Sequence, residues 1–310
     1  MSVVAELERL KKQGVKGAKR KHKENVPGHI FLAPWTLGLF AITLFPMAAT
    51  LYLAFTNYNL LQSPEWTGLD NIQRMFGDER LHNSLQVTFT YVFVGVPMQL
   101  AVSLAVAMLL DRGMRGLSFY RSVFYLPSML GSSVAIAVLW RQIFGHSGLI
   151  NQLLEMVGIE GQGWVSSPDT ALGTLIILHV WTFGAPMVIF LAGLRQIPDM
   201  YYEAAAIDGA SRFKQFFTIT IPLLTPIIFF NLVMQLINAF QNFTQAFVVS
   251  GGTGGPADST LFYTLYLYHQ GFTRFDMGYA SAMAWLLVLI IASLTAVNFL
   301  LAKYWVHYDD

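Results

Sequence analysis

The sequence predicts an all-α integral membrane protein, and both its composition and the spacing of its charges point to this fold class. Hydrophobic residues make up 55% of the 310 residues and charged residues only 12%, with a mean hydropathy of +0.50. Soluble domains of this length do not have such an apolar excess. Six windows contain no Asp, Glu, Lys or Arg: residues 30–56, 85–110, 122–140, 170–194, 223–250 and 279–302.

Each of these windows is long enough to form a transmembrane helix. A helix rises about 1.5 Å per residue, and the hydrocarbon core of a bilayer is roughly 30 Å thick. A single charge at the centre of such a helix costs about 2.5 to 3.5 kcal/mol, so the absence of charge from six windows indicates six spans. We therefore expect one six-helix transmembrane domain over residues 30–302, with short connections between the spans.

The distribution of Lys and Arg predicts how the domain is oriented. Of the 19 such residues, eight lie in residues 1–29, three in the second connection, three in the fourth and one in the tail, residues 303–310. The remaining connections hold only four. By the positive-inside rule this split places both termini and the even-numbered connections in the cytoplasm. A topology signal explains the basic cytoplasmic arm, residues 1–29, so no nucleic-acid partner is expected.

The connections expected outside the cell are short and rich in turn residues. Residues 57–84 are expected to fold over the outer mouth, and residues 141–169 have room for a short interfacial helix near 149–157. Residues 251–256 form a glycine-rich turn, but the chain has no G-x-x-x-x-G-K-[ST] motif, so it is not expected to bind ATP. It also has no cysteine, and its seven histidines lack metal-ligand spacing, so neither a metal site nor a catalytic residue is expected.

The fourth connection, residues 195–222, predicts a cytoplasmic helix with defined ends. Pro198 and Asp199 begin it, and Asp199 either caps the helix or interacts with its dipole. Glu203 lies one turn further on, where a carboxylate is still favourable. The three alanines that follow have high helix propensity and little bulk, so another surface can approach the backbone closely. Gly209 suits a left-handed turn at the C-terminal end.

Beyond this turn, Ser211 is expected to cap a second short helix through Phe216, and Pro222 to mark the return to the membrane. In their order and place, these residues resemble the EAA motif in the membrane permeases of bacterial ATP-binding-cassette (ABC) importers. The residues that carry the resemblance are Glu203-Ala204-Ala205, Asp208-Gly209-Ala210, Phe216 and Ile219-Thr220-Ile221-Pro222. Isoleucine at 221 replaces the leucine of the family pattern, which is a mild apolar exchange.

Further matches make the chain similar to the sugar-type permeases, the group that includes the maltose and glycerol-phosphate importers. The similarity extends over about residues 30–302. The large outer domain of the maltose subunit has no counterpart here, so an extended grip on a binding protein is not expected. The additional matching segments are Gly148-Leu149-Ile150-Asn151, Gly254-Gly255-Pro256, Gly271-Phe272 and Met277-Gly278-Tyr279-Ala280-Ser281-Ala282.

The resemblance implies a type I ABC importer permease bundle in the bacterial inner membrane, which is a transport subunit and not an enzyme. Its implied partners are a second permease, expected to be a different chain, two ATPase subunits and an extracytoplasmic sugar-binding protein. ATP and Mg²⁺ would bind to the partner ATPases, and this chain would bind no cofactor. The residues implied to dock and couple to the ATPases are Glu203, Ala204, Ala205, Asp208, Gly209 and Pro222.

A row of side-chain amides in the fifth span is the candidate substrate pathway. The amides recur at intervals of four, three, four and three residues, which places them on one helical face over roughly 21 Å. Carboxamides both donate and accept hydrogen bonds, as sugar hydroxyls require. The same amides also suit hydrogen bonds to neighbouring helices, so packing remains the alternative, and Gln241 is an alternative to Asn242. The row consists of Asn231, Gln235, Asn238, Asn242 and Gln245.

Two other classes of function are compatible with a membrane bundle. An ion-coupled secondary transporter of a small polar solute usually needs acidic residues or histidines within its spans, and the six windows contain no acid. An intramembrane enzyme needs a nucleophile with a base or a cluster of metal ligands, and neither is visible. His179, in the fourth window, either forms a packing hydrogen bond between helices or lines the pathway.

Overall fold

The computed structural model describes residues 28–113 and 116–307. The predicted basic arm therefore lies almost wholly outside the described residues, as does the end of the predicted tail. The described residues form helices and their connections, apart from one isolated β-bridge between Thr56 and Trp66. The prediction of an all-α chain is confirmed for these residues.

Four helices are continuous and apolar enough to cross a membrane. They are Gly28–Leu53, which contains a π-helical turn at Leu39–Leu44 and α2 at Phe45–Leu53; α4, Glu79–Asp111; Arg212–Phe240; and α15, Met277–Trp305. Two further helix pairs satisfy the same criterion together but are bent. The pairs are α5, Leu117–Leu130, with α6, Val134–Ile143, at 94°, and α8, Pro168–Trp181, with α9, Gly184–Leu194, at 42°. The structure thus has six spans when each bent pair is counted as one.

Where one transmembrane helix was predicted for the third window, residues 122–140, the structure has the two helices α5 and α6, which meet at 94°. The backbone of Ser133 is extended, and its hydroxyl accepts a hydrogen bond from the amide of Ile136, which starts α6 as a new helix. Just before it, Gly131 lies so close to Thr182 that a Cβ on this glycine would be 2.1 Å from the threonine methyl. A cap and a close tertiary contact therefore break the span within a window that is free of charge throughout.

The fifth window, residues 223–250, was also placed wrongly. The span begins at Arg212 with α11, Arg212–Gln215, passes through a π-helical turn at Phe216–Thr220 and continues as α12, Ile221–Phe240. It ends at Phe240, and the separate short helix α13, Thr244–Val249, follows after a break. The second short loop helix predicted after Ser211 is therefore the first part of this span.

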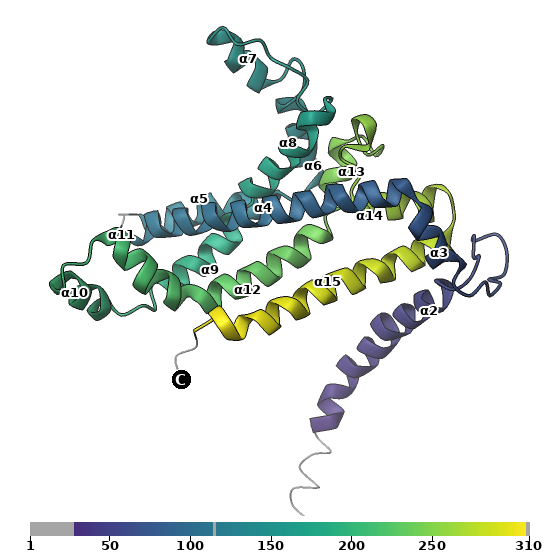
Figure 1. Cartoon of the computed structure of the whole chain (residues 1–310), viewed down its shortest axis with the longest axis horizontal. Coiled ribbons are helices and arrows are strands. Elements are labelled where there is room, and N and C mark those ends of the chain that lie inside the picture. The colour runs from purple at the N-terminus through teal and green to yellow at the C-terminus, as the bar shows by residue number, and fades with distance from the viewer. Residues whose placement is uncertain (1–27, 114–115, 308–310) are drawn as a thin grey trace, which may run out of the picture.

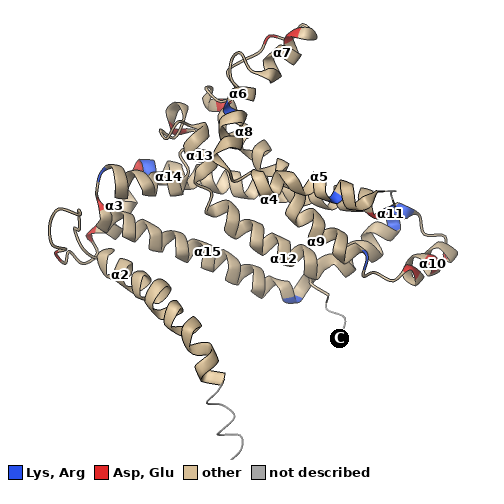
Figure 2. Ribbon diagram, turned by 180° about the vertical axis from the view of Figure 1, so that it is seen from behind, with Lys and Arg blue, Asp and Glu red and all other residues tan. Residues whose placement is uncertain are grey.

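Helix α4 contacts α8, α9, α12 and the short helix α14, Tyr263–Tyr268, while the first span packs against α15. In Figure 1, α4, α12 and α15 run along the long axis of the molecule. The loop helix α10, Asp199–Ile207, lies at the same end as the C-terminus, and α14 lies at the other end beside α3, Asp70–Gly77. Figure 2 shows Lys, Arg, Asp and Glu concentrated at the helix ends and in the connections, with long uncharged stretches between them.

At the α14 end of the bundle, two ion pairs link the end of α3 and the start of α4 to segments that are distant in sequence. Arg74 Nη1 lies 2.6 Å from Asp276 Oδ2, just before α15. Arg80 forms a two-pronged pair with Asp258, through Nε at 2.8 Å and Nη2 at 2.7 Å. These side chains are partly exposed, so each pair contributes modestly to stability.

Asp78 is the centre of a second set of contacts at this end. Its Oδ2 accepts hydrogen bonds of 2.7 Å from the hydroxyls of both Tyr266 and Tyr279, and its Oδ1 accepts one from the amide of Leu81. Burial tends to raise the pKa of Asp78, but these hydrogen bonds outweigh it and lower the pKa below its ordinary value. The ionised carboxylate therefore joins α4, α14 and α15.

The short helix predicted near 149–157 is confirmed as α7, Leu149–Met156. Asn151 organises the whole connection, because its Nδ2 donates to the carbonyls of Gly145, His146 and Gln162 while its Oδ1 accepts from Trp164 Nε1 at 2.7 Å. The Gly-Leu-Ile-Asn segment found in the sequence thus has a structural explanation.

Candidate functional site

The loop helix α10 has the ends that the sequence predicts. It follows Pro198, which has an extended backbone and makes no side-chain cap, and Asp199 lies in the first turn. Asp199 therefore interacts with the helix dipole and does not cap the helix. At the other end Gly209 has a φ of 76°, its amide donates to the carbonyl of Ala206, and the amide of Ala210 donates to that of Ala205. This pair of bonds is a Schellman motif.

Most of the predicted coupling residues are exposed on this helix and its terminal turn. Glu203, Ala204, Asp208 and Gly209 are exposed, whereas Ala205 is half-buried, and α10 has no buried residue. The side chain of Ile207, an apolar residue, is 87% exposed. The structure therefore leaves most of the surface of α10 exposed.

The base of α10 is tied to the fifth span. The hydroxyl of Tyr202 lies 2.9 Å from Thr220 Oγ1, and Gln215 Nε2 donates to the carbonyl of Ala210. Pro222 was predicted to mark the return to the membrane, but it lies within the continuous helix Arg212–Phe240. Because Pro222 has no amide proton to donate to the preceding turn, the helix widens into a π turn just before it.

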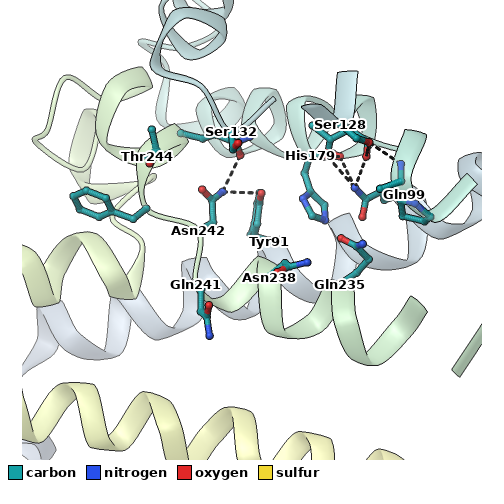
Figure 3. A pocket seen from close by; sticks show the side chains of 15 residues that line it. Tyr91, Gln99, Ser128, Ser132, His179, Gln235, Asn238, Gln241, Asn242 and Thr244 are labelled. Atoms are coloured by element: carbon teal, nitrogen blue, oxygen red, sulfur yellow. Dashed lines mark hydrogen bonds between the residues drawn. The ribbon is translucent and has the colours of Figure 1, made fainter. Parts of the chain in front are cut away.

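A polar cavity of about 400 Å³ lies inside the bundle. Its walls come from α4, α5, α8, α9, α12, α13 and the breaks between these helices, and Figure 3 shows the polar side chains that face it. No Asp, Glu, Lys or Arg of the described residues lines this cavity. The walls therefore offer hydrogen-bond donors and acceptors without a fixed charge, which suits a neutral polyhydroxylated solute.

Four of the five predicted pathway amides line the cavity, and Asn231 does not. Asn231 is fully buried in α12, and neither atom of its side-chain amide has a hydrogen-bond partner among the described residues. The single helical face predicted for the five amides is wrong, because α12 ends at Phe240 and the chain changes direction before α13. The four amides at the cavity are Gln235, Asn238, Asn242 and Gln245.

These four amides differ in whether they form hydrogen bonds within the described chain. Asn242 Nδ2 donates to the Tyr91 hydroxyl at 2.7 Å and to Gln245 Oε1 at 3.1 Å, and Gln245 Nε2 donates to the carbonyl of Gly131 at 2.7 Å. Asn242 and Gln245 thus combine packing with a place in the cavity wall. Gln235 and Asn238 form no side-chain hydrogen bond to any described residue, so they remain available to a solute in the cavity.

The cavity also contains residues that the amide pattern missed. Tyr91 and Gln99 come from α4, and His179 comes from α8. Figure 3 shows Gln99, His179 and Gln235 gathered at one end of the cavity. His179 Nε2 has no hydrogen-bond partner in the described chain, so it does not make the predicted packing bond, and its ring packs 5.2 Å from that of Tyr91. A weak signal existed, since His179 is the one histidine in the six charge-free windows.

Six spans, four of which line an uncharged polar cavity, together with an exposed loop helix at one end, are the architecture of a multi-pass membrane permease. The chain belongs to the family of binding-protein-dependent transport system inner membrane components, whose family model matches residues 79–306. This confirms the resemblance to ABC importer permeases and favours that class over an ion-coupled secondary transporter.

Two relatives match nearly the whole chain. A probable ABC transporter permease, YesP of Bacillus subtilis (strain 168), is 51% identical over 96% of this chain and 96% of its own length. The lactose transport system permease LacF of Rhizobium radiobacter is 32% identical over 91% of this chain and 96% of its own length. Both extend beyond the matched family region toward the N-terminus, so the first span belongs to the shared architecture.

Solved structures show the same fold. A bacterial ABC transporter involved in the import of the acidic polysaccharide alginate contains a chain that matches 92% of this one, with a TM-score of 0.74 and 19% identity. The match covers 98% of that chain. A bacterial alginate ABC transporter in complex with its alginate-bound periplasmic protein matches with a TM-score of 0.75. The likeness establishes the type I importer bundle.

Proposed function

We propose that this chain forms half of the translocation pathway of an ATP-driven sugar importer, and that its uncharged polar cavity holds the sugar during passage. The cavity carries the proposal, because Gln235 and Asn238 face it with amides that make no hydrogen bond within the described chain. A volume of about 400 Å³ lies within the usual range for small-molecule sites. The names of relatives, which include lactose and starch degradation product permeases, support sugars as the solute class.

Coupling to ATP hydrolysis is assigned to α10. Its exposed surface around Glu203 and Gly209 would dock onto one of two ATPase subunits, which bind ATP and Mg²⁺, while this chain binds neither. The Schellman turn and the contact between Tyr202 and Thr220 give the helix a fixed shape and a fixed attachment to the fifth span. Movement of an ATPase would then move the bundle. The free energy for this change would come from the different affinities of the transporter's inward- and outward-facing states for ATP and for the binding protein.

The apolar surface and the charge distribution support positions for the remaining partners. The helix Gly28–Leu53 has no buried residue along its apolar window, which leaves its length for lipid and for a second permease of different sequence. The C-terminal end of α15 lies at the same end of the bundle as α10. The predicted topology puts the end of α15 and α10 in the cytoplasm. The extracytoplasmic binding protein would then dock at the α14 end. The division into arm 1–29, domain 30–302 and tail 303–310 belongs to this proposal.

Replacement of Asn238 by leucine tests the proposed site. The complex with its partner permease, ATPases and binding protein is reconstituted in proteoliposomes, and uptake is measured for neutral mono- and disaccharides, including lactose. Asn238→Leu should lower uptake about fivefold or more, or change the preferred sugar, because each lost polar contact costs roughly 1 kcal/mol or more, while the complex still assembles. Gln86→Leu, an exposed position on α4, is the matched control. Lost assembly, with normal uptake per remaining complex, would assign Asn238 to packing.

A further inference from the structure

The break in the fourth span is held by side chains from two other spans. We call it the span-four joint and define it as Thr182 and Phe183, between α8 and α9, together with Gln99 and Ser103 of α4 and Ser128 of α5. The two helices of the span meet there at 42°. A break within a membrane frees backbone carbonyls that must find donors inside the protein.

Three polar side chains supply these donors. Gln99 Nε2 lies 3.1 Å from the carbonyls of His179 and Thr182 and 2.9 Å from Thr182 Oγ1, and its two protons are shared among them. Ser103 Oγ lies 3.0 Å from the carbonyl of Phe183 and 2.6 Å from that of Gln99. From α5, Ser128 Oγ donates to the Thr182 carbonyl at 2.8 Å.

The other end of the joint is equally tight. The amide of Ala185, in the first turn of α9, donates back to Ser128 Oγ at 2.8 Å. A Cβ on Gly184 would lie 2.3 Å from the carbonyl oxygen of Phe124, so α9 and α5 touch through their backbones. The joint thus locks α4, α5, α8 and α9 together at one level of the bundle.

The joint lies between the cavity and the loop helix. On one side Gln99 and His179 line the cavity, and their Oε1 and Nε2 atoms are buried without hydrogen-bond partners in the described chain. On the other side α9 leads through the short connection 195–198 to α10. Arg195 Nε, at the end of α9, lies 3.4 Å from Asp111 Oδ1, at the end of α4. The helices α9 and α4 are therefore joined both at the cavity and near α10.

We propose that Gln99 and Ser103 are positioning residues that transmit movement of α10 to the sugar cavity. A shift of α10 moves α9, and the joint carries the shift to Gln99 and His179, two of the side chains that line the cavity. A sugar that contacts Gln99 in the cavity stabilises the same side chain that holds Thr182, so an occupied cavity stiffens the joint. This inference rests on the proposed function and adds to it the means by which sugar occupancy regulates ATP hydrolysis.

Two variants separate the joint from the cavity. Ser103→Ala removes a hydroxyl that serves the joint but does not line the cavity, while Gln99→Met removes a group that does both. A sugar that the wild-type complex imports is first identified among neutral mono- and disaccharides. ATP hydrolysis by the reconstituted complex is then measured with and without binding protein that carries this sugar. Gln86→Met, exposed on the same helix, controls for the exchange of glutamine by methionine.

The stimulation ratio is the rate of ATP hydrolysis with sugar-loaded binding protein divided by the rate without it. For Ser103→Ala we expect this ratio and the amount of sugar imported per ATP to fall about fivefold, because one lost hydrogen bond of ordinary strength produces a shift of this size. The sugar concentration for half-maximal stimulation should stay unchanged. Gln99→Met should lower the ratio and also raise this concentration. These results for the two variants would support the proposed role of the span-four joint in transmission.

An unchanged stimulation ratio in Ser103→Ala, with Gln99→Met altering only the half-maximal concentration, would overturn the inference and leave the sugar site standing. A Ser103→Ala complex that loses assembly would also contradict it, because the residue would then serve folding. A wild-type complex whose ATP hydrolysis responds to no sugar-loaded binding protein would instead overturn the proposed function, and the inference with it.

Discussion

Gly209 closes α10 in a backbone conformation that residues with a Cβ rarely adopt, so Gly209→Val is a direct test of the loop helix. Its φ of 76° lies in the left-handed region, and a Cβ built there would meet no atom within 4 Å. The cost of valine is therefore backbone strain alone and not a clash. Strain of this kind costs roughly 1 to 2 kcal/mol for a residue other than glycine.

This cost would act on the Schellman turn and not on the bundle. The turn amides bond to the carbonyls of Ala205 and Ala206, and α10 has no buried residue, so little of the transmembrane packing depends on it. A penalty of that size shifts the closed turn about 5- to 30-fold toward open forms. We expect Gly209→Val to insert normally and to lose most of its transport activity.

The assay combines copurification of the ATPase subunits with sugar uptake in proteoliposomes, at matched amounts of inserted permease. Gly173→Val is the matched control, because Gly173 lies within α8, has no left-handed φ and also has no atom within 4 Å of a built Cβ. Normal uptake and normal ATPase copurification in Gly209→Val would refute the docking assignment of α10.

Two other predictions concern orientation and acid sensitivity. In this cysteine-free chain, Ser211→Cys should react with a membrane-impermeant maleimide only after the cells are opened, and labelling of intact cells would contradict the topology. The pKa of Asp78 is lowered in the folded protein, so its ionised form stabilises the fold above the ordinary value of 3.8, and the stabilisation is lost as the pH falls through the folded pKa. Asp78→Asn should therefore lower the Tm at pH 7 but narrow its gap to the wild type near pH 3, and an equal gap at both pH values would refute this explanation.

The spans could be predicted from the sequence where the membrane alone dictates them. The absence of charge located α4, α15 and the first span, because an unpaired charge in hydrocarbon is costly at any position. The left-handed turn at Gly209 was also predictable, since it depends on neighbouring residues and on the lack of a Cβ. Such features follow from local sequence.

The breaks in the spans were not predictable in this way. The break at Thr182 is held by Gln99 and Ser128, which are remote in sequence, and the break before α6 depends on contact between Gly131 and Thr182. Hydropathy averages over windows and does not register which carbonyls find donors from another helix. The end of α12 at Phe240 was missed for the same reason, because residues 223–250 are free of charge throughout.

Only the cavity residues within the predicted fifth span, residues 223–250, were predictable from the sequence. Helical spacing grouped Gln235 with Asn238, which the structure places together. Tyr91, Gln99 and His179 reach the same cavity from other spans, and no spacing rule connects residues on different helices. The amide spacing also included Asn231, which is buried away from the cavity, because periodicity does not show where a helix ends or which neighbour covers it.

Protection of a cysteine at position 238 tests the central claim, that the cavity holds the sugar, most directly. Asn238→Cys is placed in the cysteine-free chain, and its alkylation rate is measured in the reconstituted complex with and without an imported sugar delivered by the binding protein. Gln86→Cys, exposed and outside the cavity, reports any general change in reactivity. We predict that the sugar slows alkylation at 238 several-fold and leaves position 86 unaffected. An imported sugar that leaves the rate at 238 unchanged would contradict the account.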